Sequence, residues 1–588
     1  MRIANLLLAI ALCATTNPAL ADPGEDFRTL LDEVWEWRLE NNPMMASRQG
    51  DRRFNTQWRD RSLAGIEQRH LDSREFLRRV YAIDKTRLSE ADKLNYELFR
   101  RSLQQSVDSH QFNGHLMPFN QRGGVQNLDS NAAYLRFETA GDYEDWLERM
   151  GKIDSVIEQT IEVADRGIDE EMVLPRVLME RIPGQIAVQL VEDGTESPFY
   201  SVFETMPDTI SSSDEERLQK AAVEVIEEAV VPAYRKLARY FDRTYLPAAR
   251  DSYGISSLPN GSAWYEFLAR RYTTTQMTPD EIHRLGLEEV KRIRGEMQLI
   301  IDELEFEGDF KDFLTFLRTD PQFYFDNPED LYEAYLATSK RIDPELVKLF
   351  GTLPRMPYGV KPIPDAIAPD TTTAYYSRPA ADGSRAGIYW VNLYKPEVRP
   401  KYEIEVLSVH EAMPGHHLQL AIQQEIENMP KFRRYSGFTA FVEGWGLYSE
   451  SLGYDLGLYT DPYSRFGALT YDMWRAVRLV VDTGIHYKGW TRQQAIDFFA
   501  DNAAKTEYDI VNEIDRYMVM PGQALAYKVG QLKLIELRER AAAALGDDFD
   551  IRDFHSLVLD DGPLPLGLLE QRTEAWIMEE TTGTVASP

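Results

Sequence analysis

The sequence predicts a mainly α-helical protein with one small antiparallel β-sheet. Apolar residues recur at helical spacing along most of the 588 residues, and capping patterns at Thr278 and Thr491 mark two helix starts. β-branched and aromatic residues gather between residues 371 and 394, where they predict the sheet. The sequence has no internal repeat, so we expect these elements to build one large, non-repetitive fold.

Residues 1–21 have the pattern of a cleaved secretory signal. One basic residue precedes an apolar run, and small residues stand at positions 19 and 21. We expect cleavage before Asp22 and a periplasmic or secreted protein. The run is too short to span a bilayer, and no later stretch approaches 18 uninterrupted apolar residues. We therefore expect no membrane anchor after cleavage. The only cysteine, Cys13, leaves with the signal, which excludes disulfides and thiol catalysis.

The composition narrows the classes of partner. With 43% hydrophobic residues the chain can bury a large core, and its formal net charge is −31. This negative charge disfavours nucleic acid and anionic membrane surfaces as partners. A proline-rich stretch at 351–370 divides the chain into an N-terminal helical region, 22–350, and a C-terminal region, 351–588. We expect the two regions to form one compact unit with a central cleft.

The N-terminal region shows repeated helical periodicity. Helical patterns begin at Phe27 and after a capping box at Ser213. Further helical patterns cover residues 63–82, 88–109 and 142–168. The long polar loop at 113–134 is most simply a connection, although His115 and Arg122 could reach a cleft.

The sheet is predicted from TTTAYY, residues 371–376, and AGIYWVNLY, residues 386–394. Asp382-Gly383 between them favours a tight turn, so the two runs should pair as an antiparallel hairpin. Asn392 and Tyr394 at its end are candidates for contacts with a substrate, although aromatic residues on strands usually belong to a core.

Residues 404–419, IEVLSVHEAMPGHHLQ, contain three of the nine histidines and give the clearest chemical signal. His410 followed by Glu411 on a helix is typical of zinc hydrolases, in which the histidine binds the metal and the glutamate is the general base. The usual pattern has a second histidine four residues later, but this position is Pro414, and histidines follow at 416 and 417. The alternative interpretation is a helix–turn–helix corner whose histidines are incidental.

The spacing requires the helix to break at Pro414-Gly415. In an unbroken helix His416 would lie about 9 Å along the axis from His410, too far to share one metal ion. Proline and glycine together can fold the chain back and close this distance. Because His416 directly follows the turn, we predict that it is the second ligand. His417 would point about 100° away, where it could orient a ligand or, as we predict, line the substrate cleft.

A third ligand is predicted in GFTAFVEGWGLYSE, residues 437–450. Glu443 has apolar and aromatic neighbours on most sides, where an unpaired carboxylate would be costly, and a metal ion would remove this cost. Glu450 lies seven residues later on nearly the same helix face and could orient a ligand. The alternative is a solvated helix with Glu443 facing water.

Two later stretches could complete the site. Asp482 and His486 are one helical turn apart, so the carboxylate could orient the imidazole and the imidazole could stabilise an oxyanion. Arg516, Tyr517 and Tyr527 could bind a substrate carboxylate or donate to the same oxyanion. For each residue a structural hydrogen bond is the competing interpretation.

HEAMPGHHLQ and FVEGWGLYSE together resemble the paired signature of the bacterial family catalogued as domain of unknown function 885. RAVRLVVDTGIHYKGW, residues 475–490, and RYMVMPGQALAYKVG, residues 516–530, are similar to the same family, so the resemblance spans nearly the whole mature chain. The family is mostly secreted and is grouped by similarity with gluzincin metallopeptidases. The resemblance therefore implies a large helical, zincin-like fold and hydrolysis of peptide bonds.

The resulting hypothesis is a secreted zinc metallopeptidase. His410, His416 and Glu443 would hold one Zn²⁺, and Glu411 would take the proton of the attacking water and pass it to the leaving amine. An exposed strand beside the metal-binding helix would bind an extended peptide by strand addition. Iron or manganese would also suit two histidines and a carboxylate.

Two other functions stay open at this point. A metal-dependent amidase acting on N-acyl amino acids would use the same ligands with a smaller acyl pocket. A periplasmic peptide-binding protein would carry a degenerate metal site, although the intact His-Glu pair argues against it.

Overall fold

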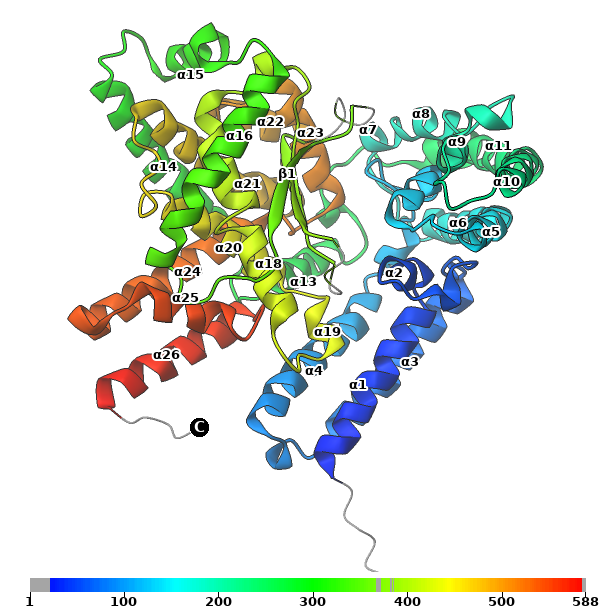
Figure 1. The fold of residues 1–588 in the computed structure, drawn as a ribbon, viewed down its shortest axis with the longest axis horizontal. Coiled ribbons are helices and arrows are strands. Elements are labelled where there is room, and N and C mark those ends of the chain that lie inside the picture. Colours follow the sequence, from blue (N-terminus) through cyan, green and yellow to red (C-terminus); the bar gives the residue numbers. More distant parts are fainter. Residues whose placement is uncertain (1–21, 366–367, 369–371, 381–382, 384, 584–588) are drawn as a thin grey trace, which may run out of the picture.

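The computed structural model describes residues 22–583 apart from 366–367, 369–371, 381–382 and 384. It is mainly helical, as predicted, and its small sheet lies among the helices of the C-terminal half (Figure 1). The predicted signal sequence lies outside the described residues. Within the part that the structure describes, no helix is long and apolar enough to cross a membrane.

The predicted N-terminal helices at 27, 63–82 and 88–109 are confirmed, and their apolar faces are buried. The pattern at 142–168 forms two helices instead of one. The helix predicted to start at Ser213 begins earlier, because Ser211 accepts the hydrogen bond that caps it. The helices before residue 260 are α1 (Pro23–Glu40), α2 (Pro43–Arg48), α3 (Leu63–Ala82), α4 (Glu90–His110), α5 (Ala140–Met150), α6 (Ile153–Asp169), α7 (Arg176–Met179), α8 (Ile182–Ala187), α9 (Ser201–Glu204), α10 (Ser212–Val225), α11 (Val231–Tyr240) and α12 (Leu246–Ala248).

The capping boxes at Thr278 and Thr491 are both confirmed, with Glu281 and Gln494 as their second members. The helices after residue 260 are α13 (Gly261–Thr273), α14 (Pro279–Glu303), α15 (Phe310–Thr319), α16 (Pro328–Ile342), α17 (Ile404–Glu411), α18 (His416–Glu425), α19 (Lys431–Arg434), α20 (Thr439–Leu452), α21 (Pro462–His486), α22 (Arg492–Asn502), α23 (Glu507–Val519), α24 (Leu525–Leu545), α25 (Ile551–Leu559) and α26 (Leu566–Thr582).

The sheet has three strands in the order β1-β3-β2. β2 (Ala374–Ser377) and β3 (Gly387–Val391) pair antiparallel, which confirms the predicted hairpin, although Asp382 of the predicted turn lies outside the described residues. β1 (Tyr358–Pro362) pairs parallel to β3, so the sheet is mixed and not purely antiparallel. The proline-rich stretch therefore supplies a strand as well as a connection.

Hydrophobic packing crosses residue 350. In Figure 1 helices α1–α11 occupy one side of the molecule and the helices from α13 onward the other. One hydrophobic cluster nevertheless combines side chains of α1 and α4 with those of α17, α20 and α24. The ring centroids of Phe99 and Phe432 are 5.1 Å apart, and Trp35 stacks on Tyr435 at 5.6 Å. N-terminal and C-terminal elements thus share one core.

Two glycines let α20 and α24 pack closely. A Cβ atom at Gly530 of α24 would lie 1.9 Å from the carbonyl oxygen of Ala440 and 2.7 Å from the Cα of Gly444, both on α20. No side chain fits into this space, so the two backbones are in direct contact. This contact sets the position of α20, which carries two of the predicted acidic site residues.

We expect Gly530→Ala to destabilise the protein by about 1–3 kcal/mol, because the added methyl group must push the two helices apart. Gly295→Ala is the matched control, since Gly295 lies on α14 with open space where its Cβ would be. The control should be unchanged or slightly more stable, by about 0.5–1 kcal/mol. Calorimetric melting of the three proteins checks this, and equal melting temperatures for Gly530→Ala and wild type would contradict it.

Candidate metal centre

The helix is interrupted between α17 and α18. α17 ends at Glu411 and α18 begins at His416, which confirms the predicted break around Gly415. A Cβ atom at Gly415 would lie 1.9 Å from the carbonyl oxygen of His410 and 2.4 Å from that of Val409. Only glycine permits this approach, which places the start of α18 directly beside the end of α17.

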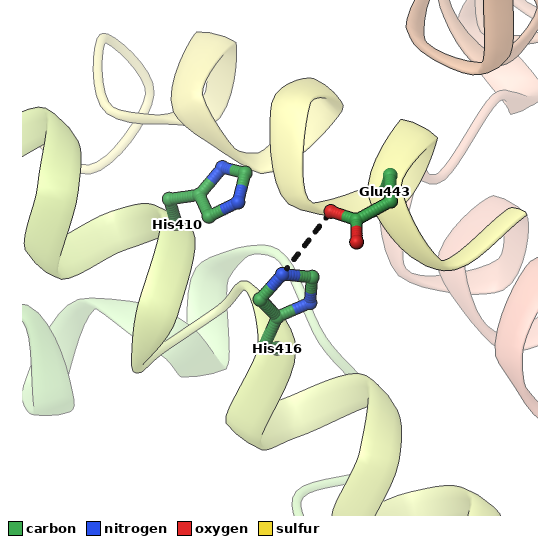
Figure 2. A group of neighbouring side chains, drawn as sticks. All are labelled: His410, His416 and Glu443. Carbon is green, nitrogen blue, oxygen red and sulfur yellow. Dashed lines mark ion pairs between the residues drawn. The ribbon is translucent and has the colours of Figure 1, made fainter. Parts of the chain in front are cut away.

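The break brings His410 and His416 together, and α20 adds Glu443 (Figure 2). One possible ligand atom from each of the three residues lies within 4.8 Å of the other two. The imidazole centroids are 4.8 Å apart with the rings at 84°, and His416 Nε2 lies 3.5 Å from a Glu443 oxygen. The three side chains predicted as ligands therefore form one group.

This group fits a divalent cation. Two imidazoles and one carboxylate are a common donor set for catalytic zinc, in which the fourth position stays open. Burial alone would raise the pKa of Glu443, but the hydrogen bond and charge of His416, with help from His410 and Arg478, lower it to about 2. Glu443 is thus ionised, as a cation ligand must be. Among the residues that the structure describes, no second group of this kind is found.

Glu450 fixes the ring of His410. Its Oε1 lies 2.8 Å from His410 Nδ1, and both side chains are buried. When Nδ1 donates its proton to this carboxylate, Nε2 keeps the lone pair that can bind a metal ion. A Cβ atom at Gly446 would come within 2.8 Å of the same ring, so this glycine makes room for the imidazole. Glu450 lies where its predicted orienting role requires.

α20 also holds the segment between α17 and α18 in place. Trp445 Nε1 donates a hydrogen bond to the carbonyl oxygen of Pro414 at 2.9 Å, and Ser449 Oγ donates to the same oxygen at 3.4 Å. All three groups are buried. The helix that supplies Glu443 thereby fixes the turn that positions His416.

Glu411 lies beside the group, and its carboxylate has no bonding partner in the described part of the chain. The side chain is half-buried and interacts electrostatically with His416. Within the described part of the chain, Glu411 makes no side-chain hydrogen bond or ion pair. Its carboxylate is therefore available to accept a proton from a molecule bound next to the three ligands.

His417 faces away from the group, so its assignment to the substrate cleft is wrong. It is 1% exposed, and its two ring nitrogens lie 2.8 Å from the hydroxyl of Tyr376 and 3.0 Å from the carbonyl oxygen of Met356. Burial lowers the pKa of His417 to about 4, so the ring is neutral. His417 anchors the sheet to α18.

The predicted substrate contact of Asn392 is also wrong. Its side chain is fully buried, and its amide group donates to the carbonyl oxygens of Ala368 and Thr372. Asn392 also accepts from the backbone N–H of Tyr394, which is itself partly exposed. The asparagine secures the end of β3.

The predicted pairing of Asp482 with His486 does not form. The ring nitrogens of His486 lie 3.1 Å from the backbone nitrogen of Ile255 and 3.0 Å from the carbonyl oxygen of Tyr517, and the side chain is fully buried. Asp482 instead accepts from the hydroxyl of Tyr265 and a backbone N–H. His486 cannot reach an oxyanion, so its predicted catalytic role is wrong.

A second polar group lies on α21, α23 and α24. The hydroxyl of Tyr517 donates to Glu513 at 2.6 Å and accepts from Arg478 Nε at 2.8 Å. Tyr517 is 1% exposed, so it holds these two partners and cannot contact substrate as predicted. Arg516 lies 3.4 Å from the same Glu513, and half-buried Tyr527 lies under the guanidinium of Arg478.

Arg475 and Arg478 are the site residues that the sequence reasoning missed. Both are buried on α21: Arg475 lies 3.5 Å from Glu450, and Arg478 interacts with Glu443 and Glu513. Two arginines on a helix whose other residues are largely apolar were the available signal, because buried arginines need anionic partners.

Of the two loop residues considered, only Arg122 approaches this second group. It interacts electrostatically with Arg516, Glu513 and Tyr527. His115 instead stacks on His110 at a centroid distance of 5.0 Å. The loop at 113–134 is thus more than a connection.

Residues 43–573 match the profile of a family described as "Bacterial protein of unknown function (DUF885)". The chain belongs to the DUF885 family. No curated protein matches this DUF885 chain. The resemblance predicted from the two motifs is therefore confirmed at the level of the family.

Two solved structures resemble this DUF885 protein. One, described as "the putative lipoprotein from Colwellia psychrerythraea", is 28% identical with a TM-score of 0.89, and the match covers 95% of this chain and 100% of that chain. The other, "a putative lipoprotein of unknown function from Shewanella oneidensis", is 18% identical with a TM-score of 0.72 over 94% of this chain and 99% of that chain. The second shares the fold alone.

We expect His416→Ala to abolish binding of Zn²⁺ and His417→Ala to retain most of it, because only His416 lies in the group of three. His417→Ala should instead be less stable by about 1–3 kcal/mol, since two buried polar groups lose their partner. Metal content by plasma emission and melting by circular dichroism separate the two effects. Loss of the metal in His417→Ala but not in His416→Ala would show that His417 is the ligand in place of His416.

We expect Glu443→Ala to lose the metal ion, whereas Glu450→Ala should weaken its binding by about 10- to 100-fold, because Glu450 acts only through His410. Titration of the metal-free proteins with Zn²⁺ measures both affinities. Equal affinities of Glu443→Ala and wild type would remove Glu443 from the ligand set.

Proposed function

We propose that this DUF885 protein is a zinc-dependent metallopeptidase that hydrolyses peptide bonds. The observation that carries the proposal is the convergence of His410, His416 and Glu443 beside the uncommitted carboxylate of Glu411. Three ligands with an adjacent general base are the minimum for attack by an activated water. A structural site would instead use four protein ligands.

The residues of the site have separate roles in the proposed hydrolysis. A zinc ion held by His410, His416 and Glu443 would lower the pKa of a bound water towards 7 and polarise the scissile carbonyl. Glu411 accepts the proton of the attacking water and delivers it to the nitrogen of the leaving amine. Glu450 keeps His410 in the tautomer that presents Nε2 to the metal position.

Strand addition, predicted for an exposed strand beside the metal-binding helix, requires a strand with a free edge. β3 is paired on both sides within the described sheet, so it has no free edge. β2 pairs only with β3 and packs against α17, which carries His410. We therefore assign strand addition of an extended peptide to the edge of β2.

The proposed location is the periplasm or the exterior of the cell. The solved structure that is 28% identical is described as a "putative lipoprotein", and the signal pattern at 1–21 agrees with export.

The direct test is incubation of the purified, zinc-loaded protein with a peptide library, followed by mass spectrometry. Cleaved peptides that disappear when the zinc is removed by a chelator support the proposal and report the scissile bond. A parallel incubation with N-acyl amino acids detects amidase activity. Binding of peptides without any cleavage would favour a peptide-binding protein instead.

We expect Glu411→Gln to keep its metal ion and fold but to lose about 10²- to 10⁴-fold in kcat, because an amide cannot accept the proton of water. Turnover, metal content and circular dichroism are measured on the same preparation. A metal-replete Glu411→Gln protein with wild-type turnover would refute the proposed mechanism.

A further inference from the structure

Two arginines beside the metal-ligand group share a single carboxylate. Arg478 Nη2 lies 3.1 Å from Glu513, and Arg516 Nη1 lies 3.4 Å from the same side chain. The arginine side chains are only 6% and 10% exposed. Both buried arginines therefore have the same carboxylate as their ion-pair partner.

Arg122 adds a third positive charge from the N-terminal half. The side chain of the preceding residue, Gln121, is bonded to α23, because its Nε2 donates to the carbonyl oxygen of Asp515 at 3.2 Å. The Arg122 side chain is exposed and interacts electrostatically with Arg516 and Glu513. Within the described residues its guanidinium has no hydrogen bond or ion pair. We call Arg122, Arg478, Arg516 and Tyr527 the arginine group.

The arginine group lacks an anion. Within the described residues Glu513 is the one carboxylate that forms an ion pair with its guanidinium groups, in a protein whose formal net charge is −31. Arg478 Nη1 is buried and has no hydrogen-bond partner among the described residues. A buried, unpaired donor of a charged group is costly, so these residues are arranged for a negatively charged molecule that the chain itself does not supply.

The group also borders the metal ligands. Arg478 interacts electrostatically with Glu443, and its guanidinium carbon lies 4.5 Å from the centroid of the Tyr527 ring. Tyr527 is on α24, whose Gly530 is in direct contact with the Glu443-bearing helix α20. An anion bound here lies close to the position of the proposed reaction.

We propose that the arginine group binds the C-terminal carboxylate of a peptide, so that the enzyme releases one or two residues from the free C-terminus. A planar carboxylate matches the paired donors of guanidinium groups, and the Tyr527 hydroxyl is a further donor. This inference rests on the proposed function. Water is consumed as the C–N bond breaks: its oxygen joins the carbonyl carbon of the shortened peptide, and the released amino acid or dipeptide gains a proton on its nitrogen.

The test compares three synthetic peptides of one sequence with the zinc-loaded protein. The first peptide has a free C-terminus, and the second has a C-terminal amide. The third also ends in an amide but has glutamate as its last residue, so that its carboxylate is on a side chain. We expect the free acid to be shortened from its C-terminus with a kcat/KM about 10- to 100-fold above that of the plain amide. Equal rates for acid and amide, or equal rates for the acid and the glutamate peptide, would overturn the assignment to the C-terminal carboxylate.

Variants assign the effect to the residues. Arg122→Ala and Arg516→Met should raise KM for the free acid by about tenfold or more, so that the preference for the free acid over the amide falls. Arg217→Ala is the matched control, because Arg217 is an exposed arginine paired with Glu144 and Asp214. Arg122 is exposed, so its substitution should not disturb folding. A free-acid KM in Arg122→Ala and Arg516→Met equal to that of the control would refute the inference.

Binding without turnover separates this inference from the proposed function. Calorimetry with zinc-loaded Glu411→Gln should show about tenfold tighter binding of the free acid than of the amide. If the wild-type protein hydrolyses no peptide but Glu411→Gln shows this preference, the peptidase proposal fails and the carboxylate site stands. If peptides are hydrolysed but acid and amide bind equally, the carboxylate site fails and the peptidase proposal stands.

Discussion

The candidate metal centre depends on one close approach of backbone to backbone. Gly415 brings α18 against the last carbonyl groups of α17, at a distance that leaves no room for a Cβ atom. Without this approach His410 and His416 would lie on one straight helix, about 9 Å apart along its axis. Trp445 and Ser449 donate hydrogen bonds to the turn, so the geometry of the two histidines is also tied to α20.

α20 and α21 together organise the polar groups around this turn. α20 supplies Glu443 and Glu450 from two successive parts of one face, and its own position is set by the glycine contact with α24. α21 packs against α14 along its length and places Arg475 near Glu450 and Arg478 near Glu443. Buried charges on two adjacent helices thus hold each other in fixed positions, which is the preorganisation that a reactive site requires.

The sequence predicts the parts of this arrangement that local geometry determines. A His-Glu pair, a Pro-Gly break and a glutamate among apolar residues lead to the group of His410, His416 and Glu443, since each inference needs only helix geometry and the cost of a buried charge. The predictions for His417, Asn392 and His486 fail for the opposite reason. Their partners are groups such as the Met356 carbonyl and the Ile255 N–H, which lie 61 and 231 positions away in the chain. Local spacing contains no information about such partners. For the same reason the role of Arg478 could not be predicted from local spacing.

The shared core of α1, α4 and the C-terminal helices has a consequence for the folding of the newly synthesised chain. Phe99 packs on Phe432, and Trp35 packs on Tyr435. Helices that are synthesised early therefore cannot complete their packing until residues more than 300 positions downstream have been added. Such contacts of high sequence separation form late, because closing so long a loop costs entropy before any packing is gained. The ligand-bearing helices belong to the same cluster. The side chains of His410, His416 and Glu443 therefore converge only after nearly the whole polypeptide has been synthesised, and a nascent chain lacks this group.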